Sequence, residues 1–399
     1  ADNHLQHGNE LGLDPRRIVL RRVIDLNERS LRDIIVGLGG PKHGVPRRDG
    51  FNITPASEVM AILCLAEDYG DLGRRMARMV VGFTYKGEPV RADALQAVGA
   101  MQVLLRDAIH PNLVQSLEGT PAFVHGGPFA NIAQGTNTAV ATRLALKLAD
   151  YVVTEAGFAT ELGAEKFFHI KCRLAGLQPS AAVIVATAKA VAYHGGFKED
   201  GGLGNLAQHI ANIRRFGLEP VVALNRFTDD SPADLRKIIA FCARQGVEAV
   251  IAEHYAKGGE GALALAKAVQ RVTTKHRQPK LKFLYPLEAP LEKKIETVAR
   301  QLYGADGVDF DRSARGHLEL PLAFTSVGID SEEVAGDHAH KVSLAVGFDQ
   351  NGGRVSRPFN GLSPGLVGPG GDRLAAPNRL AGALVQGRHR GFPAARRHD

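Results

Sequence analysis

Short apolar runs that alternate with helical stretches constrain the fold of this 399-residue chain more than any other feature. Each run has the length and the β-branched content of a buried parallel strand. The runs occupy residues 122–124, 151–154, 182–186, 220–224 and 247–251. This alternation predicts an α/β fold with a doubly wound, mainly parallel sheet, whose ligands bind past the carboxyl ends of the strands.

Helical periodicity appears in three further segments. Residues 57–66 repeat apolar side chains with the period of a helix, and Ser57 is in a position to cap its first turn. The face of this helix that we expect to be buried consists of Met60, Ile62, Leu63 and Leu65. Residues 90–108 and 291–304 show the same period. We therefore predict a helix in each segment.

The composition is typical of a soluble globular protein, with 44% hydrophobic and 23% charged residues. No apolar stretch reaches the roughly eighteen residues that a transmembrane helix needs. The three cysteines are far apart, so neither a zinc site nor a disulfide framework is indicated. The first residues lack the pattern of a signal peptide. We expect a cytoplasmic protein with no membrane partner.

The net charge of +7 leaves two interpretations open. The chain is either an ordinary basic protein or one that carries a pocket for polyanions such as ATP or polyglutamylated folate. A nucleic-acid partner is disfavoured, because Trp is absent and no basic run is interleaved with aromatic residues.

A first polar cluster, HGGPFANIAQG, follows the apolar run at 122–124 and covers residues 125–135. Glycines let the backbone approach a ligand closely, and amides at a helix start can hold an anion. His125 and Asn131 add neutral polar groups. The alternative is a tight turn that needs glycine for its geometry alone.

A second cluster lies at the end of the run at 151–154. Thr154 and Glu155 would be delivered to the carboxyl end of a strand. An acid in that position suits a magnesium shell, or it can orient water during phosphoryl transfer. An ion pair between Glu155 and a structural Lys166 is the alternative.

Two further clusters each pair an aromatic residue with polar neighbours at a strand end. Asn225-Arg226-Phe227 follows the run at 220–224, and YAKGGEG at 255–261 follows the run at 247–251. Aromatic rings on successive strand ends could hold a flat heterocycle between them. The alternatives are that Phe227 belongs to the core and that residues 255–261 form a helix cap with a solvated lysine.

Taken in order, these segments resemble formate–tetrahydrofolate ligase over about the first 310 residues. The stretches that carry the resemblance are NLVQSLEGTPAFVHGGPFANIAQG (112–135), DYVVTEAGFATELGAEKFFHIKC (150–172) and VATAKAVAYHGG (185–196). The segments NIRRFGLEPVVALNRF, YAKGGEG and KIETVARQLYGADG continue it. So many long matches in one order are not expected by chance.

The resemblance implies a nucleotide-binding α/β domain related to P-loop NTPases, followed by smaller α/β domains. It also implies an ATP-dependent ligase of one-carbon metabolism and purine biosynthesis. Formate would attack the γ-phosphate of ATP to give formyl phosphate, and N10 of tetrahydrofolate would then attack the formyl carbon. The products would be 10-formyltetrahydrofolate, ADP and phosphate. Mg²⁺, a monovalent cation and a homotetrameric assembly are typical of the family.

The site residues that the resemblance implies fall into three groups. His125, Asn131 and Glu155 would be catalytic. The loop at formyl phosphate would consist of Gly126, Gly127, Ala130 and Asn131. The folate would be bound by Phe227, Tyr255 and Asn225, beside a flexible ligand loop of Lys257, Gly258, Gly259 and Glu260.

Three positions depart from the family pattern. Tyr255 stands where the family usually has Trp, so a smaller ring would stack on the folate. Gln134 stands where His is usual. Lys189-Ala190-Val191-Ala192 replaces an Arg-Ala-Leu-Lys segment and carries one charge less.

The two ends of the chain depart further. No Gly-Lys pair occurs in the 399 residues, so a phosphate loop that ends in Gly-Lys-Thr is absent and the sequence looks N-terminally truncated. We expect three regions: the remaining part of the nucleotide-binding domain (1–203), a second α/β domain with the folate-stacking aromatics (204–305), and an atypical C-terminal region (306–399). The last region is rich in Gly, Arg, Pro and His, which suggests out-of-frame translation or disorder. A genuine basic interaction tail is the rival hypothesis.

Three functions follow from these features. The first is ATP-dependent ligation of formate to tetrahydrofolate by the parent protein, with this chain alone inactive for want of the phosphate loop. The second is a catalytically inactive remnant that binds folate or supports oligomerisation. An unrelated P-loop ATPase is disfavoured, because its phosphate loop would also have to be missing.

Overall fold

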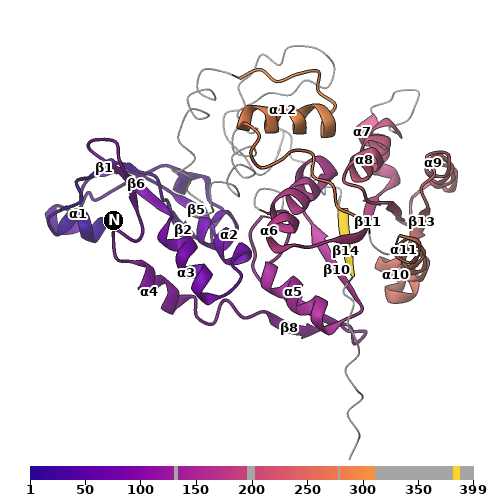
Figure 1. Ribbon diagram of the computed structural model, residues 1–399, viewed down its shortest axis with the longest axis horizontal. Helices are drawn as coiled ribbons and strands as arrows, with labels where there is room; N and C mark the ends of the chain where they lie inside the picture. Colours follow the sequence, from indigo (N-terminus) through magenta and orange to yellow (C-terminus); the bar gives the residue numbers. More distant parts are fainter. Residues whose placement is uncertain (130–133, 196–202, 277–278, 311–380, 387–399) are drawn as a thin grey trace, which may run out of the picture.

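A computed structural model describes residues 1–129, 134–195, 203–276 and 279–310, and the backbone of a strand at 381–386. Figure 1 shows two parts: an N-terminal part of small sheets and helices, and a larger part built around a five-stranded sheet. The predicted C-terminal region (306–399) lies almost entirely outside the described residues. None of the helices in the described ranges is both long and apolar enough to cross a membrane.

The N-terminal part contains three small sheets. An antiparallel sheet has the order β1-β6-β7, β2 pairs with β5 in parallel, and β3 pairs with β4 antiparallel. These strands are β1 (Leu13–Ile18), β2 (Arg22–Ile24), β3 (Ile34–Val36), β4 (Arg47–Asp49), β5 (Phe51–Ile53), β6 (Val80–Thr84) and β7 (Pro89–Arg91). The helices here are α1 (Asp2–Gln6), α2 (Glu58–Leu65), α3 (Tyr69–Ala77) and α4 (Val98–Leu104).

The larger sheet has the order β10-β14-β11-β12-β13, and β11, β12 and β13 are parallel. The edge strand is β10. The strand β14 lies between β10 and β11 and pairs antiparallel with both. The five strands are β10 (Tyr151–Ala156), β11 (Pro179–Ala186), β12 (Pro220–Asn225), β13 (Ala249–Ala252) and β14 (Ala381–Gln386). The mixed α/β fold with its parallel strands agrees with the predicted fold class.

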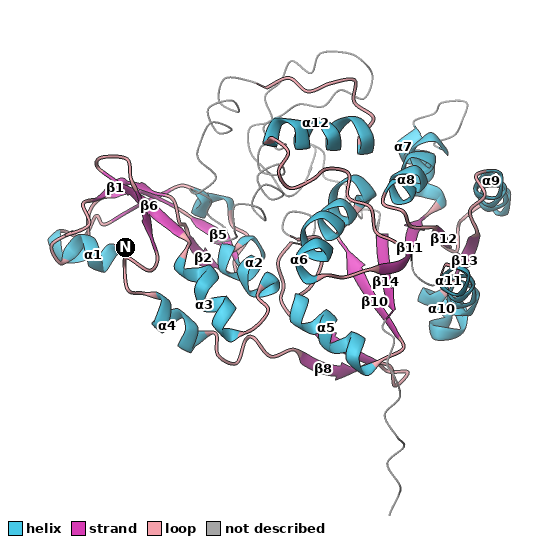
Figure 2. Cartoon of the chain, viewed as in Figure 1, coloured by secondary structure: helices cyan, strands magenta, loops and turns pink. Residues whose placement is uncertain are grey.

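Helices pack on this sheet, as the cyan coils of Figure 2 show. The helix α8 contacts β11 and β12, and α11 contacts β11, β12 and β13. The helices of this part are α5 (Ala139–Leu148), α6 (Arg173–Ala175), α7 (Ala188–Gly195), α8 (Leu203–Arg215), α9 (Pro232–Arg244), α10 (His254–Lys257), α11 (Leu263–Lys275) and α12 (Leu291–Leu302). Two π-helical segments precede α6: η4 (Ala159–Ala164) and η5 (Phe167–Cys172).

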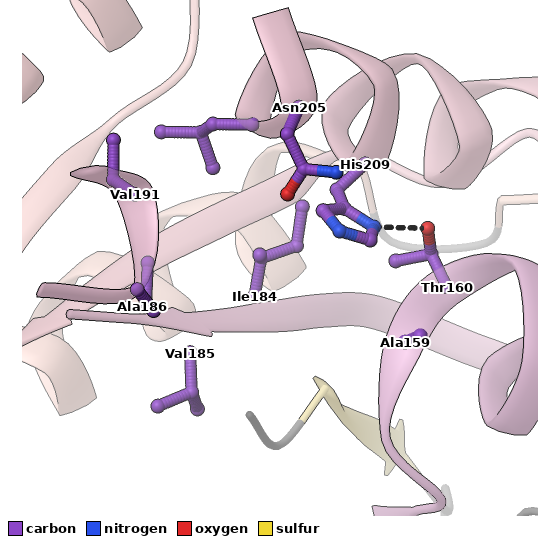
Figure 3. Close-up of a pocket in the computed structure, with 10 residues that line it drawn as sticks. Ala159, Thr160, Ile184, Val185, Ala186, Val191, Asn205 and His209 are labelled. Carbon is purple, nitrogen blue, oxygen red and sulfur yellow. Dashed lines mark hydrogen bonds between the residues drawn. The ribbon is translucent and has the colours of Figure 1, made fainter. Parts of the chain in front are cut away.

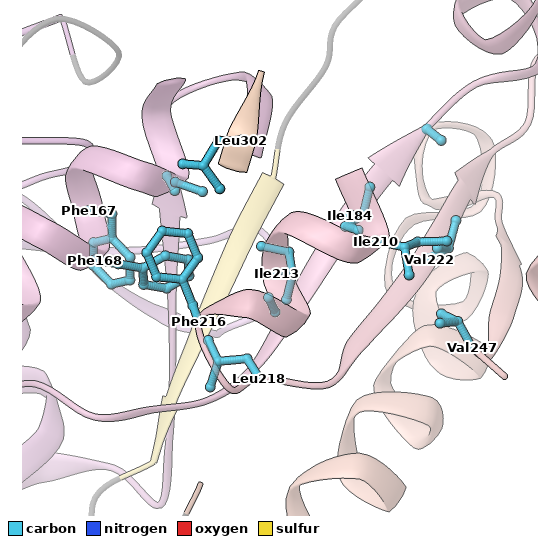
Figure 4. Packing of buried hydrophobic residues seen from close by; sticks show 14 of the residues in the cluster. Phe167, Phe168, Ile184, Ile210, Ile213, Phe216, Leu218, Val222, Val247 and Leu302 are labelled. Carbon is cyan, nitrogen blue, oxygen red and sulfur yellow. The ribbon is translucent and has the colours of Figure 1, made fainter. Parts of the chain in front are cut away.

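One hydrophobic core connects the sheet with its helices. The rings of Phe167 and Phe168 lie 5.4 Å apart, and Phe168 packs on Phe216 of the segment after α8 at 4.6 Å (Figure 4). Leu302 of α12 belongs to the same buried cluster. This core therefore holds residues from both sides of the predicted boundary at 203/204, and the boundary itself stays a prediction.

Four of the five predicted strands lie in the large sheet. One of them, β10, pairs antiparallel with β14 and alternates exposed and buried residues, so its prediction as a buried parallel strand is wrong. The run at 122–124 lies outside this sheet, and its prediction as a buried parallel strand is also wrong. It forms β9 (Pro121–Val124), which pairs antiparallel with β8 (Asn112–Gln115) in a largely exposed two-stranded hairpin. The reason is local: the turn before it, with Gly119 at φ +80°, folds the chain back.

The predicted helices fare differently. Ser57 caps α2 by accepting the amide of Met60, and α12 covers most of 291–304, so both predictions are confirmed. The helix predicted over 90–108 is wrong in its first half. Pro89–Arg91 forms β7, and a turn closed by the bond from the Gln96 amide to the Asp93 carbonyl separates it from α4.

Candidate functional site

The carboxyl ends of β12 and β13 lie side by side. Asn225, the last residue of β12, pairs in register with Ala252, the last residue of β13. The amide of Arg226 donates to the Ala252 carbonyl at 3.1 Å. The residues that follow the two strands are therefore neighbours, as the sequence predicts for two parallel strands.

Glu253 joins the two aromatic clusters. One carboxylate oxygen accepts from Arg226 Nη1 at 3.0 Å, and the other accepts from Lys257 Nζ at 2.7 Å. The hydrogen bond from Lys257, assisted by the charge of Arg226, lowers the pKa of Glu253. We call these three residues the strand-end bridge. The sequence reasoning missed Glu253, although a charged residue directly after a buried strand is a usable signal.

Phe227 is 48% exposed, so it lies outside the core. Its amide donates to a carboxylate oxygen of Asp230 at 2.8 Å, which fixes the backbone. The Nζ atom of Lys189 lies 5.3 Å from the ring centroid and also pairs with Asp229 at 2.6 Å. Lys189 is one of the positions that depart from the family pattern, and its contact with Phe227 was not predicted.

The side-chain oxygen of Asn225 is buried and has no hydrogen-bond partner among the described residues. A buried acceptor without a donor costs free energy, so such atoms often mark the place of a ligand group or an ordered water. Asn225 Oδ1 at the end of β12 can therefore accept a hydrogen bond from a ligand N–H.

Tyr255 extends into solvent, with 98% of its surface exposed. It belongs to the short helix α10, between Glu253 and Lys257 of the strand-end bridge. The ring contacts among the described residues do not include one between Phe227 and Tyr255. The two rings are thus on neighbouring strand ends without stacking on each other.

The second residue of the predicted ligand loop is a glycine with positive φ. Gly258 has φ +57°, and Gly259 donates its amide to Glu118 at 2.6 Å. Glu260 is exposed. Lys257 pairs with Glu253 but stays 55% exposed at the end of α10, with Gly258 as the C-cap, so the alternative of a helix cap with a solvated lysine remains open.

His125 is buried, and both of its ring nitrogens have protein partners. Nε2 lies 2.7 Å from the carbonyl of Ala108, which can only accept, so Nε2 carries the proton. Nδ1 lies 2.8 Å from the hydroxyl of Thr138, which accepts the Ala141 amide and donates to the ring. Burial lowers the pKa of His125 against the opposing effect of the Ala108 hydrogen bond. The neutral ring therefore anchors the start of the loop.

The two glycines after His125 differ in their surroundings. A Cβ atom on Gly126 would lie 2.4 Å from the sulfur of Cys64, and Gly126 has φ +70°. A Cβ atom on Gly127 would meet nothing within 4 Å. Ala130 and Asn131, predicted for the same loop, lie outside the described residues.

A fully buried lysine lies close to this loop. Lys171 donates from Nζ to Asn137 Oδ1 at 2.7 Å and to the hydroxyl of Thr142 at 2.8 Å. Burial lowers its pKa to about 7. A neutral amine has two N–H groups, which these two acceptors satisfy. Sequence reasoning missed this residue, because a lysine in an otherwise mixed segment carries no sign of burial.

Glu155 is exposed near the end of β10, whereas Lys166 is buried between the two π-helical segments. Within the described ranges, no group of three His, Cys, Asp or Glu side chains could hold a metal ion. Mg²⁺ often keeps several waters and binds through one carboxylate and substrate phosphates. Glu155 could supply such a single ligand, and its role in a magnesium shell stays a prediction.

A small cavity lies beside the end of β11 and α8 (Figure 3). His209 reaches its wall and contacts the hydroxyl of Thr160 through Nδ1 at 2.7 Å. Most of the lining is apolar, including Ile184 and Val191. None of the predicted site residues lines this cavity. The candidate site is therefore the surface at the ends of β12 and β13, with the loop that begins at His125 and the predicted ligand loop at 257–260.

Known proteins match most of the chain. The family model for formate–tetrahydrofolate ligase matches residues 1–334. A formate–tetrahydrofolate ligase of Symbiobacterium thermophilum is 56% identical over 331 residues, which are 80% of this chain and 59% of that protein. One of Paracoccus denitrificans is 52% identical over 341 residues, 80% of this chain and 61% of that protein. The chain thus spans about three fifths of the relatives it matches, and it belongs to the formate–tetrahydrofolate ligase family.

Proposed function

We propose that the protein containing this chain joins formate to tetrahydrofolate at the expense of ATP. The products are 10-formyltetrahydrofolate, ADP and phosphate, and the route passes through formyl phosphate. The observation that carries the proposal is the in-register pairing of Asn225 with Ala252. In support, an aromatic residue, an amide oxygen without a hydrogen-bond partner and a charged bridge lie together at one edge of a parallel sheet.

The reaction divides between two neighbouring surfaces. A carboxylate is a poor acyl donor, and phosphorylation of formate supplies a good leaving group. The loop that begins at His125 is the proposed site of the formyl phosphate, where glycine backbone can approach closely. Catalysis there is chiefly positioning and stabilisation of charge on phosphate oxygens.

The proposed folate surface consists of Phe227, Tyr255 and Asn225. Phe227 offers an exposed ring at a fixed backbone position, and stacking on a pteridine uses that ring face. Asn225 Oδ1 accepts from the pteridine. The loop from Lys257 to Glu260 closes beside the bound folate, and Glu155 contributes to Mg²⁺ binding with the ATP phosphates. A monovalent cation, a homotetrameric assembly, a cytoplasmic location and a role in purine biosynthesis complete the proposal.

A second function is favoured by one sequence feature. The 399 residues contain no Gly-Lys pair, and a phosphate loop supplies the backbone amides and the lysine that cradle ATP. Each lost contact with a charged phosphate costs on the order of 1.5–3 kcal/mol. This chain alone is then a non-catalytic folate-binding or oligomerisation remnant.

Calorimetric titration separates the two functions. Purified chain is titrated with a reduced folate, then with MgATP, and 10-formyltetrahydrofolate is measured after formate is added. Folate binding with an ATP response and product formation would assign ligase activity to these 399 residues themselves and overturn the expectation that this chain alone is inactive. Folate binding without an ATP response supports the remnant. If the chain binds no folate, both assignments of the strand-end surface are wrong.

A further inference from the structure

A glutamate from a distant part of the chain reaches the predicted ligand loop. Glu118 lies at the tip of the β8–β9 hairpin, and its Oε1 atom accepts the amide of Gly259 at 2.6 Å. The two residues are 141 positions apart in the sequence. This contact therefore joins two segments that the sequence reasoning treated as separate.

The glycines of the loop fit the carboxylate closely. A Cβ atom on Gly258 would lie 2.5 Å from Glu118 Oε1, and one on Gly259 would lie 2.3 Å from Oε2. No real Cβ contact is that short, so the carboxylate lies against bare backbone at both positions. We call residues 257–261 the glycine turn; a Cβ atom at either glycine would force the Glu118 carboxylate, the far end of a flexible side chain, to shift.

The hairpin that carries Glu118 is well braced. The amide of Thr120 donates to the Ser116 hydroxyl at 3.0 Å, and the Gly119 amide donates to the Ser116 carbonyl at 3.0 Å. The strand β9 then leads directly into His125, which the hydroxyl of Thr138 and the carbonyl of Ala108 hold in place. The tip and the base of the hairpin are thus both fixed.

The glycine turn is fixed from its other side by the strand-end bridge. The amide of Glu253 donates to the Gly261 carbonyl at 3.0 Å, and its carboxylate holds Lys257 and Arg226. Continuous contacts therefore run from Phe227 through Glu253 and the glycine turn to Glu118, and on to His125. They connect the surface proposed for folate with the loop proposed for formyl phosphate.

We propose that Glu118 is a positioning residue that sets where the glycine turn, and Tyr255 with it, stands relative to the His125 loop. The inference rests on the proposed function, because it concerns the same folate surface. A formyl transfer needs its two reactants at a defined separation, and a displacement of about 1 Å can cost a large part of the rate. Glu118 touches neither reactant; it acts through the turn.

The test compares three variants of the whole chain by calorimetric titration with 5-formyltetrahydrofolate, a stable reduced folate. Glu118→Ala removes the contact, and we expect about fivefold weaker binding, the loss typical of one hydrogen bond. Glu118→Gln keeps an acceptor oxygen and should bind within about twofold of wild type. Glu88→Ala is the matched control, since it removes the same charge at an exposed position of the N-terminal part.

Hydrogen exchange supplies a readout that general destabilisation would not give. In Glu118→Ala the Gly259 amide should exchange about fivefold faster, while core amides of β12 keep their rates. The Glu88→Ala control should leave both rates unchanged. Rescue of slow exchange and of binding by Glu118→Gln would support a role for the acceptor oxygen itself.

Three outcomes would overturn the inference. If Glu118→Ala binds as wild type does while Phe227→Ala loses binding, the folate surface stands and Glu118 does not position it. If Glu118→Ala binds more tightly, the carboxylate competes with the ligand. If neither Glu118→Ala nor Phe227→Ala alters binding, the proposed function fails together with the inference.

Discussion

The Nδ1 atom of His125 and the hydroxyl of Thr138 lie 2.8 Å apart, so the first residue of the glycine-rich loop is fastened to the N-cap of α5. The loop therefore begins and ends at fixed points. Gly126, directly after His125, passes close to Cys64 and Thr138 in a left-handed conformation. The sequence shows only that this loop is rich in glycine. In the structure, Gly126 has no room for a Cβ atom, whereas Gly127 has open space around it.

Gly126→Ala should destabilise the protein, because a Cβ atom would meet the Cys64 sulfur and φ is positive. We expect a loss of about 2 kcal/mol in the free energy of unfolding, measured in urea. Gly127→Ala is the matched control one residue away, where the space is open, and it should stay within about 0.5 kcal/mol of wild type. Equal losses in the two variants would contradict this account of the loop.

Phe227→Ala should weaken the binding of 5-formyltetrahydrofolate by about tenfold or more, because a ring face would no longer stack on the pteridine. The change should have little effect on stability, since half of the side chain is already exposed. Titration calorimetry measures the affinity, and Tyr85→Ala, at a 62% exposed ring in the N-terminal part, controls for the loss of an aromatic surface. Unchanged affinity in Phe227→Ala would place the folate elsewhere.

Tyr255→Trp should tighten reduced-folate binding by about threefold, because the larger ring offers more stacking area. The same titration measures the affinity, and a urea unfolding curve measures stability. The free energy of unfolding should not change, since the side chain is almost fully exposed in the free protein. Weaker binding in this variant would show that the position does not face the ligand.

Glu253→Gln should loosen the strand-end bridge, because Arg226 and Lys257 would lose their shared counter-charge. We expect reduced-folate affinity to fall by about threefold, the effect of a partly exposed ion pair. Glu248→Gln is the control: Glu248 directly precedes β13, at the opposite end from the candidate site, and pairs with Arg271. Similar affinities in the two variants would show that the bridge does not shape the site.

Lys171→Met should change how stability depends on pH. Burial lowers the pKa of Lys171 to about 7 in the folded state, whereas an unfolded lysine titrates near 10.4. Between these values the unfolded chain binds an extra proton, so stability rises with pH by about 1.4 kcal/mol per unit from this group. The free energy of unfolding, measured in urea at several pH values from 7.5 to about 9.5, should rise less steeply in Lys171→Met.

The exposed Lys147 supplies the control for this experiment. Lys147→Met removes a charge from α5 at a position open to solvent and should leave the slope as in wild type. Below about pH 7 Lys171 is protonated in both the folded and the unfolded chain, so its contribution to stability no longer changes with pH. A wild-type slope in Lys171→Met would mean that the buried amine stays charged throughout.

The parallel strands β11 and β12 were predictable because a buried parallel strand leaves a continuous apolar run, whereas β14 was not predicted at all. The residues of β11 and β12 are nearly all buried, and their runs stood out in the sequence. The exposed hairpin strand β9 was misread because its short apolar run resembles a buried one. The four residues of β9 do not distinguish an exposed hairpin strand from a buried parallel one, but the turn at Gly119 does.

The candidate site was predictable where it lies at strand ends and unpredictable where it depends on long-range contacts. The position of Phe227 and Tyr255 on neighbouring ends follows from parallel pairing of β12 with β13. The contact between Glu118 and Gly259 does not, since it joins a hairpin tip to a loop 141 residues away. Burial of Lys171 is likewise a property of the packed fold and leaves no local pattern.

The solvent exposure of Tyr255 bears on how this enzyme family can adapt. A side chain that packs on almost nothing within its own protein can be exchanged by selection with little effect on folding. Under the proposed function, a change of the ring at position 255 can therefore alter reduced-folate binding while the sheet beneath remains the same.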